Sequence, residues 1–250
     1  MPDFIKIYGE RNTGTKYLNR LIQLNIDVRA VSGVVPRPIS RLQNRLPGDH
    51  WVKDLYFRLT FAQNLGWKHS TPLSPEALRS HPLVARGIAF VTLTKNPYAW
   101  LLSLHRRPYA RRHGRESTFE EFLESPWMTP HRENAERRLP NPIELWNRKN
   151  TAYLGLRELG GLNVTSEDLL RDPAEAMRRI REHFGLRAKS DGFANYEEST
   201  KEAGKDNEYY RDYYLNERWR SELSEAAVRI VDGHVDHALM EQFGYAVLSH

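Results

Sequence analysis

A short loop near the N-terminus has the residue types of an anion-binding site. It runs from Gly9 to Lys16 (GERNTGTK), between a strand-like segment and a segment with helical spacing, and we call it the first loop (residues 9–16). At such a junction, backbone N–H groups and the positive end of a helix can hold a phosphate or a sulfate. The alternative is a glycine turn that only joins the strand to the helix.

The residue order of the first loop differs from that of a Walker A loop. In a Walker A loop, the lysine is followed directly by a serine or threonine whose hydroxyl holds magnesium. Here Lys16 comes after Thr15 and is followed by Tyr17. The sequence therefore predicts an anion site that needs no magnesium.

A second set of such residues follows the strand-like run Ile88–Thr94. Lys95 stands where a nucleoside triphosphatase would carry an acidic residue to organise magnesium. A lysine attracts an anion instead, and the helix that opens at Pro97 would add free N–H groups and the Ser103 hydroxyl. Two anion sites at the ends of neighbouring parallel strands predict one ligand with two separated anionic groups. Alternatively, Lys95 and Ser103 are ordinary solvated residues.

Strand-like and helix-like segments alternate along the chain. The expected strands are Phe4–Tyr8, Ile88–Thr94 and Leu162–Thr165. The expected helices lie around Tyr17–Ile22, at Phe57–Leu65, after Ser74, from Pro97, at Pro142–Leu159, at Pro173–Phe184 and, as one helix or a pair, at Ser221–Phe243. This alternation predicts a single α/β domain over residues 1–250, with a mainly parallel central sheet flanked by helices.

Three stretches lack a regular pattern. Val31–Pro47 carries scattered prolines and arginines, and we expect a loop with at most one short strand. Residues 106–142 are rich in arginine and proline and predict a basic, irregular insertion around a short helix near Phe119–Leu123. The polar stretch Lys189–Asp212 predicts a mobile loop.

Composition narrows the classes of protein that fit. The 250 residues are 40% hydrophobic and 28% charged, as in a globular protein, and no apolar run is long enough to span a membrane or to form a signal peptide. The chain has no cysteine, which excludes disulfides and thiolate chemistry and fits a reducing cytoplasm. Its net charge of +5 is consistent with an anionic ligand and does not require a nucleic acid.

Four motifs, in the same order, resemble those of the sulfotransferases that use 3′-phosphoadenosine 5′-phosphosulfate (PAPS). Besides the first loop and the segment from Lys95 to Ser103, they are Ser166–Pro173 with its following helix, and the ending Val235–Tyr245. The resemblance implies a three-layer, P-loop-like fold. It implies that the first loop binds the 5′-phosphosulfate and that Lys95 and Ser103 bind the 3′-phosphate.

The same resemblance implies transfer of a sulfuryl group from PAPS to a hydroxyl or amine of a small molecule or glycan, by in-line displacement and without a metal. His69 would be the general base, and Lys68 and Lys16 would stabilise charge. The implied donor-binding residues are Arg11, Asn12, Thr13, Gly14, Thr15, Lys16, Tyr17, Lys95 and Ser103.

The chain departs from the family pattern at three places. Asn12 stands where the first loop commonly has a cation, and Ser166 replaces a tyrosine. No clear copy of the family's C-terminal basic-glycine loop is present, although Lys201, Gly204 and Lys205 lie in that region.

Several alternatives remain open from the sequence. A nucleotide-dependent kinase and a non-catalytic nucleotide-binding module are the competing functions. His69 could be an ordinary loop histidine, with His50 and His105 as weaker candidates for the base, and Glu10 could orient Lys16 or replace the base. The arginines of residues 106–115 form either a solvated surface or a region that steers an anionic acceptor.

Overall fold

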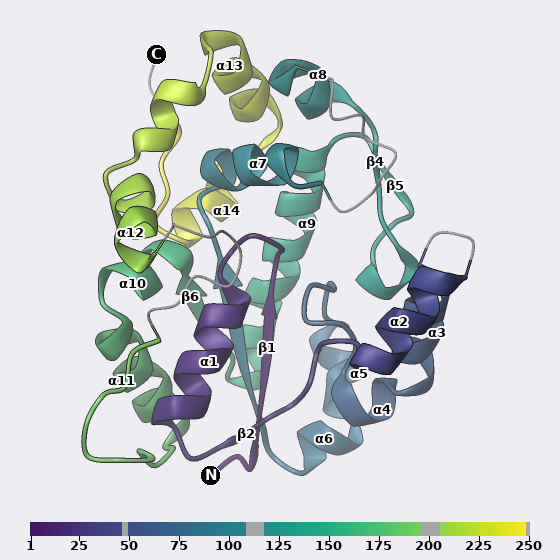
Figure 1. The fold of residues 1–250 in the computed structure, drawn as a ribbon, viewed down its shortest axis with the longest axis vertical. Coiled ribbons are helices and arrows are strands. Elements are labelled where there is room, and N and C mark those ends of the chain that lie inside the picture. The colour runs from purple at the N-terminus through teal and green to yellow at the C-terminus, as the bar shows by residue number, and fades with distance from the viewer. Residues whose placement is uncertain (47–49, 109–117, 197–205, 249–250) are drawn as a thin grey trace.

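A four-stranded parallel sheet forms the centre of the computed structural model, which describes residues 1–46, 50–108, 118–196 and 206–248 (Figure 1). The strand order is β2-β1-β3-β6, with β1 at Phe4–Gly9, β2 at Arg29–Ala30, β3 at Ile88–Thr94 and β6 at Leu162–Thr165. All three neighbouring pairs are parallel. This confirms the predicted α/β class with a parallel central sheet flanked by helices.

The register of the two central strands aligns the two candidate anion sites. Phe4 pairs with Ile88, and the pairing continues without a gap to Gly9 and Leu93. A side chain at position 9 could not be accommodated, because its Cβ would lie 2.8 Å from the Leu93 carbonyl oxygen. The first loop and Lys95 therefore leave the sheet at the same edge and side by side.

Helices cover both faces of the sheet and create three layers. On one side, α1 (Thr15–Asn25) and α11 (Pro173–Phe184) pack on the β3 residues Ala89, Val91 and Leu93. On the other side, Ile88 and Phe90 pack against α5 (Pro75–Arg79), α6 (Pro82–Ala85) and α9 (Pro142–Gly155) with the 3₁₀ turn η2 (Leu156–Leu159). Because successive side chains of a strand point to opposite faces, the unbroken apolar run of β3 supplies both layers.

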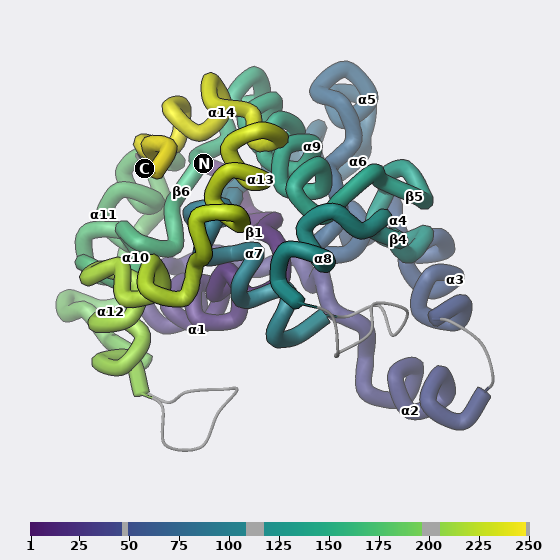
Figure 2. The backbone as a smooth tube through the Cα atoms, turned by 90° about the horizontal axis from the view of Figure 1, so that it is seen from above, coloured from purple at the N-terminus to yellow at the C-terminus, as the bar shows by residue number. Residues whose placement is uncertain are grey.

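A third group of helices lies beyond the carboxyl ends of the strands. These are α7 (Pro97–Arg106), α8 (Phe119–Glu124), α13 (Glu225–His234) and α14 (His237–Gln242), together with the 3₁₀ turn η3 (Arg218–Glu222). They share one buried cluster with α9 that includes Trp100, Trp127, Trp146 and Trp219. Figure 2, seen from above, shows α7 passing over this end of the sheet.

Two expectations for residues 31–65 are wrong. The stretch expected as a loop contains the helix α2 (Arg37–Arg45), because Pro36 and Pro38 lie at the start of the helix, where the missing N–H groups cost nothing. The helix expected at Phe57–Leu65 is instead α3 (Trp51–Leu59) followed by α4 (Phe61–Asn64). Thr60 lies at the end of the first and at the start of the second.

The segments expected to be irregular contain more structure than predicted. The basic insertion holds α8, as predicted, and also the antiparallel pair β4 (Trp127–Met128) and β5 (Arg138–Leu139), with a 3₁₀ turn, η1 (His131–Glu133), between them. Within the stretch predicted as a mobile loop, α12 (Asn207–Leu215) begins after Asp206, whose side chain caps it. The short helix α10 (Ser166–Arg171) completes the fold. No helix in the described parts of the chain has the length and apolar character to cross a bilayer.

Candidate functional site

A cavity of about 510 Å³ opens at the carboxyl ends of β1 and β3. Its wall brings together every site residue that the sequence suggested: Arg11, Asn12, Thr13, Gly14, Thr15, Lys16, Tyr17, Lys68, His69, Lys95 and Ser103. His50 and His105, the weaker candidates for a base, do not line it. The residues Arg111, Arg112, Arg115, Lys201, Gly204 and Lys205 lie outside the described part of the chain.

The carbonyl groups of the first loop are held by the protein behind it. Trp100 Nε1 donates to the Arg11 carbonyl at 2.9 Å, and Ser166 Oγ donates to the Thr13 carbonyl at 2.6 Å. Ser166 thus supplies an anchor for the loop. With its carbonyls held this way, the loop is free to turn N–H groups toward the cavity.

The N–H groups at the start of α1 are available to a ligand. Gly14 adopts a φ of 94°, a backbone conformation that favours glycine, and no side chain caps the helix. Among the described residues, the N–H groups of Gly14, Thr15 and Lys16 have no hydrogen-bond acceptor. A helix N-terminus with free donors and an exposed lysine is suited to bind an anion.

Lys95 and Ser103 form a buried pair directly beside the first loop. Lys95 Nζ donates to Ser103 Oγ at 3.2 Å and to the Asn12 carbonyl at 3.5 Å. Asn12 Nδ2 donates to the Ser103 carbonyl at 3.2 Å, so two hydrogen bonds join the loop to the pair. Only 1% of Lys95 is exposed, and this burial lowers the pKa of its amine to about 7.

The expectation of free N–H groups at the start of α7 is wrong. The Asn96 side chain accepts hydrogen bonds from the N–H groups of Tyr98, at 3.1 Å, and Ala99, at 3.5 Å. The helix is therefore capped by its own N-cap residue, and Pro97 has no N–H to offer. The Lys95–Ser103 pair consequently offers side chains to a ligand, whereas the first loop offers backbone N–H groups.

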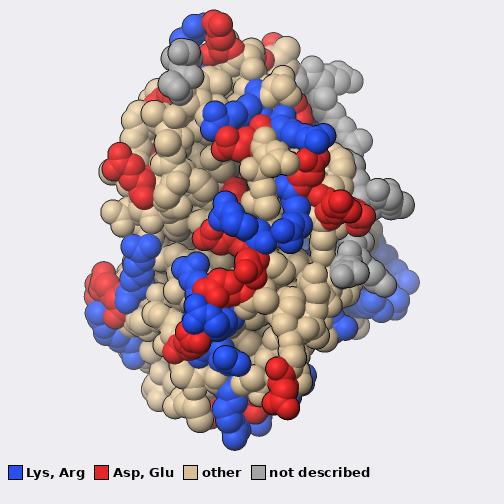
Figure 3. Space-filling view, turned by 90° about the vertical axis from the view of Figure 1, so that its left-hand side faces the viewer, with Lys and Arg blue, Asp and Glu red and all other residues tan. Residues whose placement is uncertain are grey.

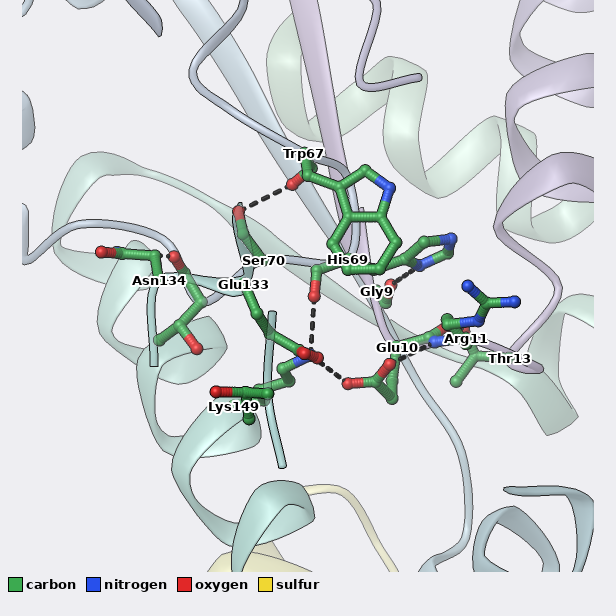
Figure 4. Close-up of polar contacts among 12 residues, drawn as sticks. Gly9, Glu10, Arg11, Thr13, Trp67, His69, Ser70, Glu133, Asn134 and Lys149 are labelled. Atoms are coloured by element: carbon green, nitrogen blue, oxygen red, sulfur yellow. Dashed lines mark hydrogen bonds and ion pairs between the residues drawn. The ribbon is translucent and has the colours of Figure 1, made fainter. Parts of the chain in front are cut away.

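The ring of His69 is oriented by the end of β1. His69 Nδ1 lies 2.6 Å from the Gly9 carbonyl oxygen (Figure 4). Because a carbonyl can only accept, Nδ1 carries the proton in the neutral ring and Nε2 keeps its lone pair. Burial, and then the neighbouring Lys68 charge, holds the pKa of His69 well below its usual value. The ring is thus neutral at physiological pH and can accept a proton at Nε2.

A buried charge network lies behind the first loop and His69. Lys149 of α9 pairs with both Glu10 and Glu133, and it donates to the His69 carbonyl at 2.6 Å (Figure 4). Glu10 also accepts from the Arg11 N–H at 2.6 Å, and burial raises the pKa of its carboxyl. Glu10 neither lines the cavity nor orients Lys16, so both roles suggested for it are wrong. It anchors the loop instead.

Side chains of β1 hold the segment that leads to Lys68 and His69. Lys6 Nζ donates to the carbonyls of Asn64, at 2.5 Å, and Gly66, at 2.6 Å, while the Tyr8 hydroxyl donates to the Leu65 carbonyl at 2.6 Å. The buried Lys6 amine has a pKa lowered to about 7 by desolvation. Sequence reasoning missed Lys6, although a lysine inside an apolar strand was the signal that could have revealed it.

Sequence reasoning also missed the aromatic wall of the cavity. Four tyrosines of α12 line it: Tyr209, Tyr210, Tyr213 and Tyr214. Their spacing places them along one side of a helix, but Tyr209 and Tyr210 lie within the predicted loop Lys189–Asp212, and Tyr213 and Tyr214 directly follow it. On the face shown in Figure 3, basic and acidic side chains are interspersed. Among the exposed ion pairs of the described residues is Arg178–Glu175, at 2.6 Å. Among the described residues, no group of three or more His, Asp or Glu side chains is arranged to hold a metal.

Comparisons with known proteins find similarity to solved structures but not to known sequences. No protein-family model matches the sequence, and no curated protein matches it. A solved sulfotransferase domain from the curacin biosynthetic pathway is similar over 99% of this chain and 99% of its own, with 12% identity and a TM-score of 0.47. Two structures of retinol dehydratase, one with retinol and PAP and one with androsterone and PAP, are similar over 100% of this chain and 83% of theirs, with 13% identity and a TM-score of 0.43.

Proposed function

We propose that this chain transfers a sulfuryl group from PAPS to a hydroxyl or amine of a small-molecule or glycan acceptor. The observation that carries the proposal is the contact between the two anion sites. Lys95 Nζ lies 3.5 Å from the Asn12 carbonyl oxygen, and both sites open into the cavity that also contains His69. One nucleotide with a phosphate at each end of its ribose fits this pair of sites.

Different residues would bind the two ends of PAPS. The N–H groups of Gly14, Thr15 and Lys16 would hold the 5′-phosphosulfate, and Lys95 with Ser103 would hold the 3′-phosphate. In sulfuryl transfer, charge collects on the equatorial oxygens and on the leaving phosphate, as in phosphoryl transfer. Lys16 and Lys68, which line the same cavity, supply positive charge there.

His69 would accept the proton of the acceptor. As the acceptor oxygen forms its bond to sulfur, the bond from sulfur to the 5′-phosphate oxygen breaks and the bisphosphate leaves with those electrons. The hydroxyl proton passes to Nε2 of His69, which is unprotonated because Nδ1 donates to the Gly9 carbonyl. The lowered pKa of His69 keeps this nitrogen available at neutral pH.

A nucleotide-dependent kinase is less consistent with these residues. Lys95 stands at the strand end where a magnesium-organising acid would be needed, and it is buried against Ser103. A thermal-shift comparison separates the two functions. Adenosine 3′,5′-bisphosphate without metal should stabilise the protein by about 2.7 kcal/mol at a hundred times its dissociation constant. ATP or GTP with magnesium should stabilise it less, and the reverse order would support a kinase.

Transfer of radiolabelled sulfate from PAPS to a panel of phenols, amines and saccharides tests the activity itself. With an acceptor found in this way, His69→Ala should lower kcat by about 10²- to 10⁴-fold while leaving bisphosphate affinity nearly unchanged. His183→Ala, on the exposed surface of α11, is the matched control. Wild-type turnover in His69→Ala would remove its role as base. Bisphosphate binding without any transfer would favour a non-catalytic module.

A further inference from the structure

One tyrosine of α12 covers the Lys95–Ser103 pair. Lys95 Nζ lies 3.4 Å from the centroid of the Tyr214 ring, which is a cation–π contact. The Tyr214 hydroxyl lies 3.2 Å from Ser103 Oγ. Both groups assigned above to the 3′-phosphate are therefore engaged by a single side chain.

The three N–H donors of the Lys95 ammonium face three groups: Ser103 Oγ, the Asn12 carbonyl and the Tyr214 ring. Ser103 Oγ accepts from Lys95 and lies 2.8 Å from the Ala99 carbonyl, in addition to its contact with Tyr214. The face of an aromatic ring attracts a cation and repels an anion. A phosphate can reach Lys95 and Ser103 only if the Tyr214 ring moves away.

The first loop is not covered in this way. Lys16 is exposed, and the N–H groups of Gly14, Thr15 and Lys16 have no acceptor among the described residues. A nucleotide that carries only a 5′-phosphate could bind there without moving Tyr214. A ligand can therefore reach the first loop without moving Tyr214, whereas it can reach the Lys95–Ser103 pair only after Tyr214 has moved.

We propose that Tyr214 competes with the 3′-phosphate for the Lys95–Ser103 pair, an inference that rests on the proposed function. The side chain contacts both members of the Lys95–Ser103 pair and gives way only to a group with enough charge to replace both of its contacts. A phosphate monoester meets that condition and a ribose hydroxyl does not. Binding of the bisphosphate therefore displaces Tyr214, whereas binding of adenosine 5′-monophosphate leaves it in place.

The surroundings of Tyr214 are consistent with movement of this one side chain. The preceding residue, Tyr213, fixes the helix, because its hydroxyl donates to Glu222 at 2.6 Å and accepts from Arg106 at 3.0 Å. Tyr214 stacks on Tyr210, with ring centroids 6.3 Å apart, and it is only partly buried. It can leave Lys95 while α12 keeps its anchor.

Calorimetric titration with two ligands tests the inference. Adenosine 3′,5′-bisphosphate and adenosine 5′-monophosphate are each titrated into the wild-type protein, Tyr214→Ala and Tyr214→Phe. Tyr214→Ala should bind the bisphosphate about 5- to 30-fold more tightly than wild type, since a competing cation–π contact is lost. Its affinity for the monophosphate should stay unchanged. Tyr214→Phe keeps the ring and loses only the hydroxyl contact, so its gain should be smaller.

A control variant and three further outcomes decide whether the change in affinity comes from Tyr214. Glu208→Gln, on the same helix but outside the cavity wall, should leave the ratio of the two affinities at its wild-type value. Weaker bisphosphate binding in both Tyr214 variants would overturn the inference, because the hydroxyl would then be a ligand of the phosphate. Equal gains for both nucleotides, or no change for either, would also overturn it. If neither wild type nor Tyr214→Ala prefers the bisphosphate, the proposed function fails instead.

Discussion

The two candidate anion sites are built on opposite principles. The first loop offers backbone N–H groups at the start of α1, and its Arg11 and Thr13 carbonyls accept hydrogen bonds from Trp100 and Ser166. The Lys95–Ser103 pair offers buried side chains that Tyr214 contacts. Backbone N–H groups carry no charge to bury. A buried lysine must lose its charge or have a partner, so the second site should depend more strongly on the ligand's charge and on pH.

The support behind the first loop gives the largest expected effect. Lys149→Met leaves the buried carboxylates of Glu10 and Glu133 without their cation, and it should lower the free energy of unfolding by about 3–5 kcal/mol. Urea denaturation measures this change. The matched control is Arg178→Met, whose ion pair with Glu175 is fully exposed and should contribute far less. Similar losses in the two variants would contradict a structural role for the network.

Substitutions at the two sites should separate their contributions to binding. Lys95→Met should weaken binding of adenosine 3′,5′-bisphosphate by about 1–3 kcal/mol, as expected for one charge-assisted contact, and should not change binding of the 5′-monophosphate. Lys16→Met should weaken binding of both nucleotides. Calorimetry measures the affinity of each of the two variants for each of the two nucleotides. An unchanged bisphosphate affinity in Lys95→Met would remove this residue from the site.

The pH dependence of binding should distinguish the same two sites. Because the pKa of Lys95 is lowered to about 7 in the free protein, the amine loses its charge as the pH rises above that value. A bound phosphate favours the charged amine, so binding above pH 7 takes up a proton. The bisphosphate affinity should then fall with rising pH, at most about tenfold per pH unit. Titrations between pH 7 and pH 9 measure the slope, and the same slope in Lys95→Met would show that another group causes it.

Much of the fold could be predicted because its signals are local. The apolar run of β3 and the N-cap residues Asn96 and Asp172 mark element boundaries within a few residues of sequence. The first loop and Lys95 could be placed together because parallel strands end at a common edge. The prolines at the start of α2 misled the prediction, since proline both interrupts helices and begins them.

The supporting contacts of the site could not be predicted from local patterns. Glu10 and Lys149 are 139 residues apart, and Ser103 and Tyr214 are 111 apart. Nothing in the neighbourhood of either partner indicates the other. The start of α7 was also predicted only in part. The helix begins at Pro97 as expected, but the Asn96 side chain accepts hydrogen bonds from the N–H groups that were expected to face the ligand.

A crystal structure with adenosine 3′,5′-bisphosphate tests most directly whether one ligand joins the two sites. The 5′-phosphate should accept from the N–H groups of Gly14, Thr15 and Lys16. The 3′-phosphate should lie within about 2.7–3.2 Å of Lys95 Nζ and Ser103 Oγ, with the Tyr214 ring displaced. A complex in which the 3′-phosphate points to solvent while Tyr214 still covers Lys95 would contradict the account.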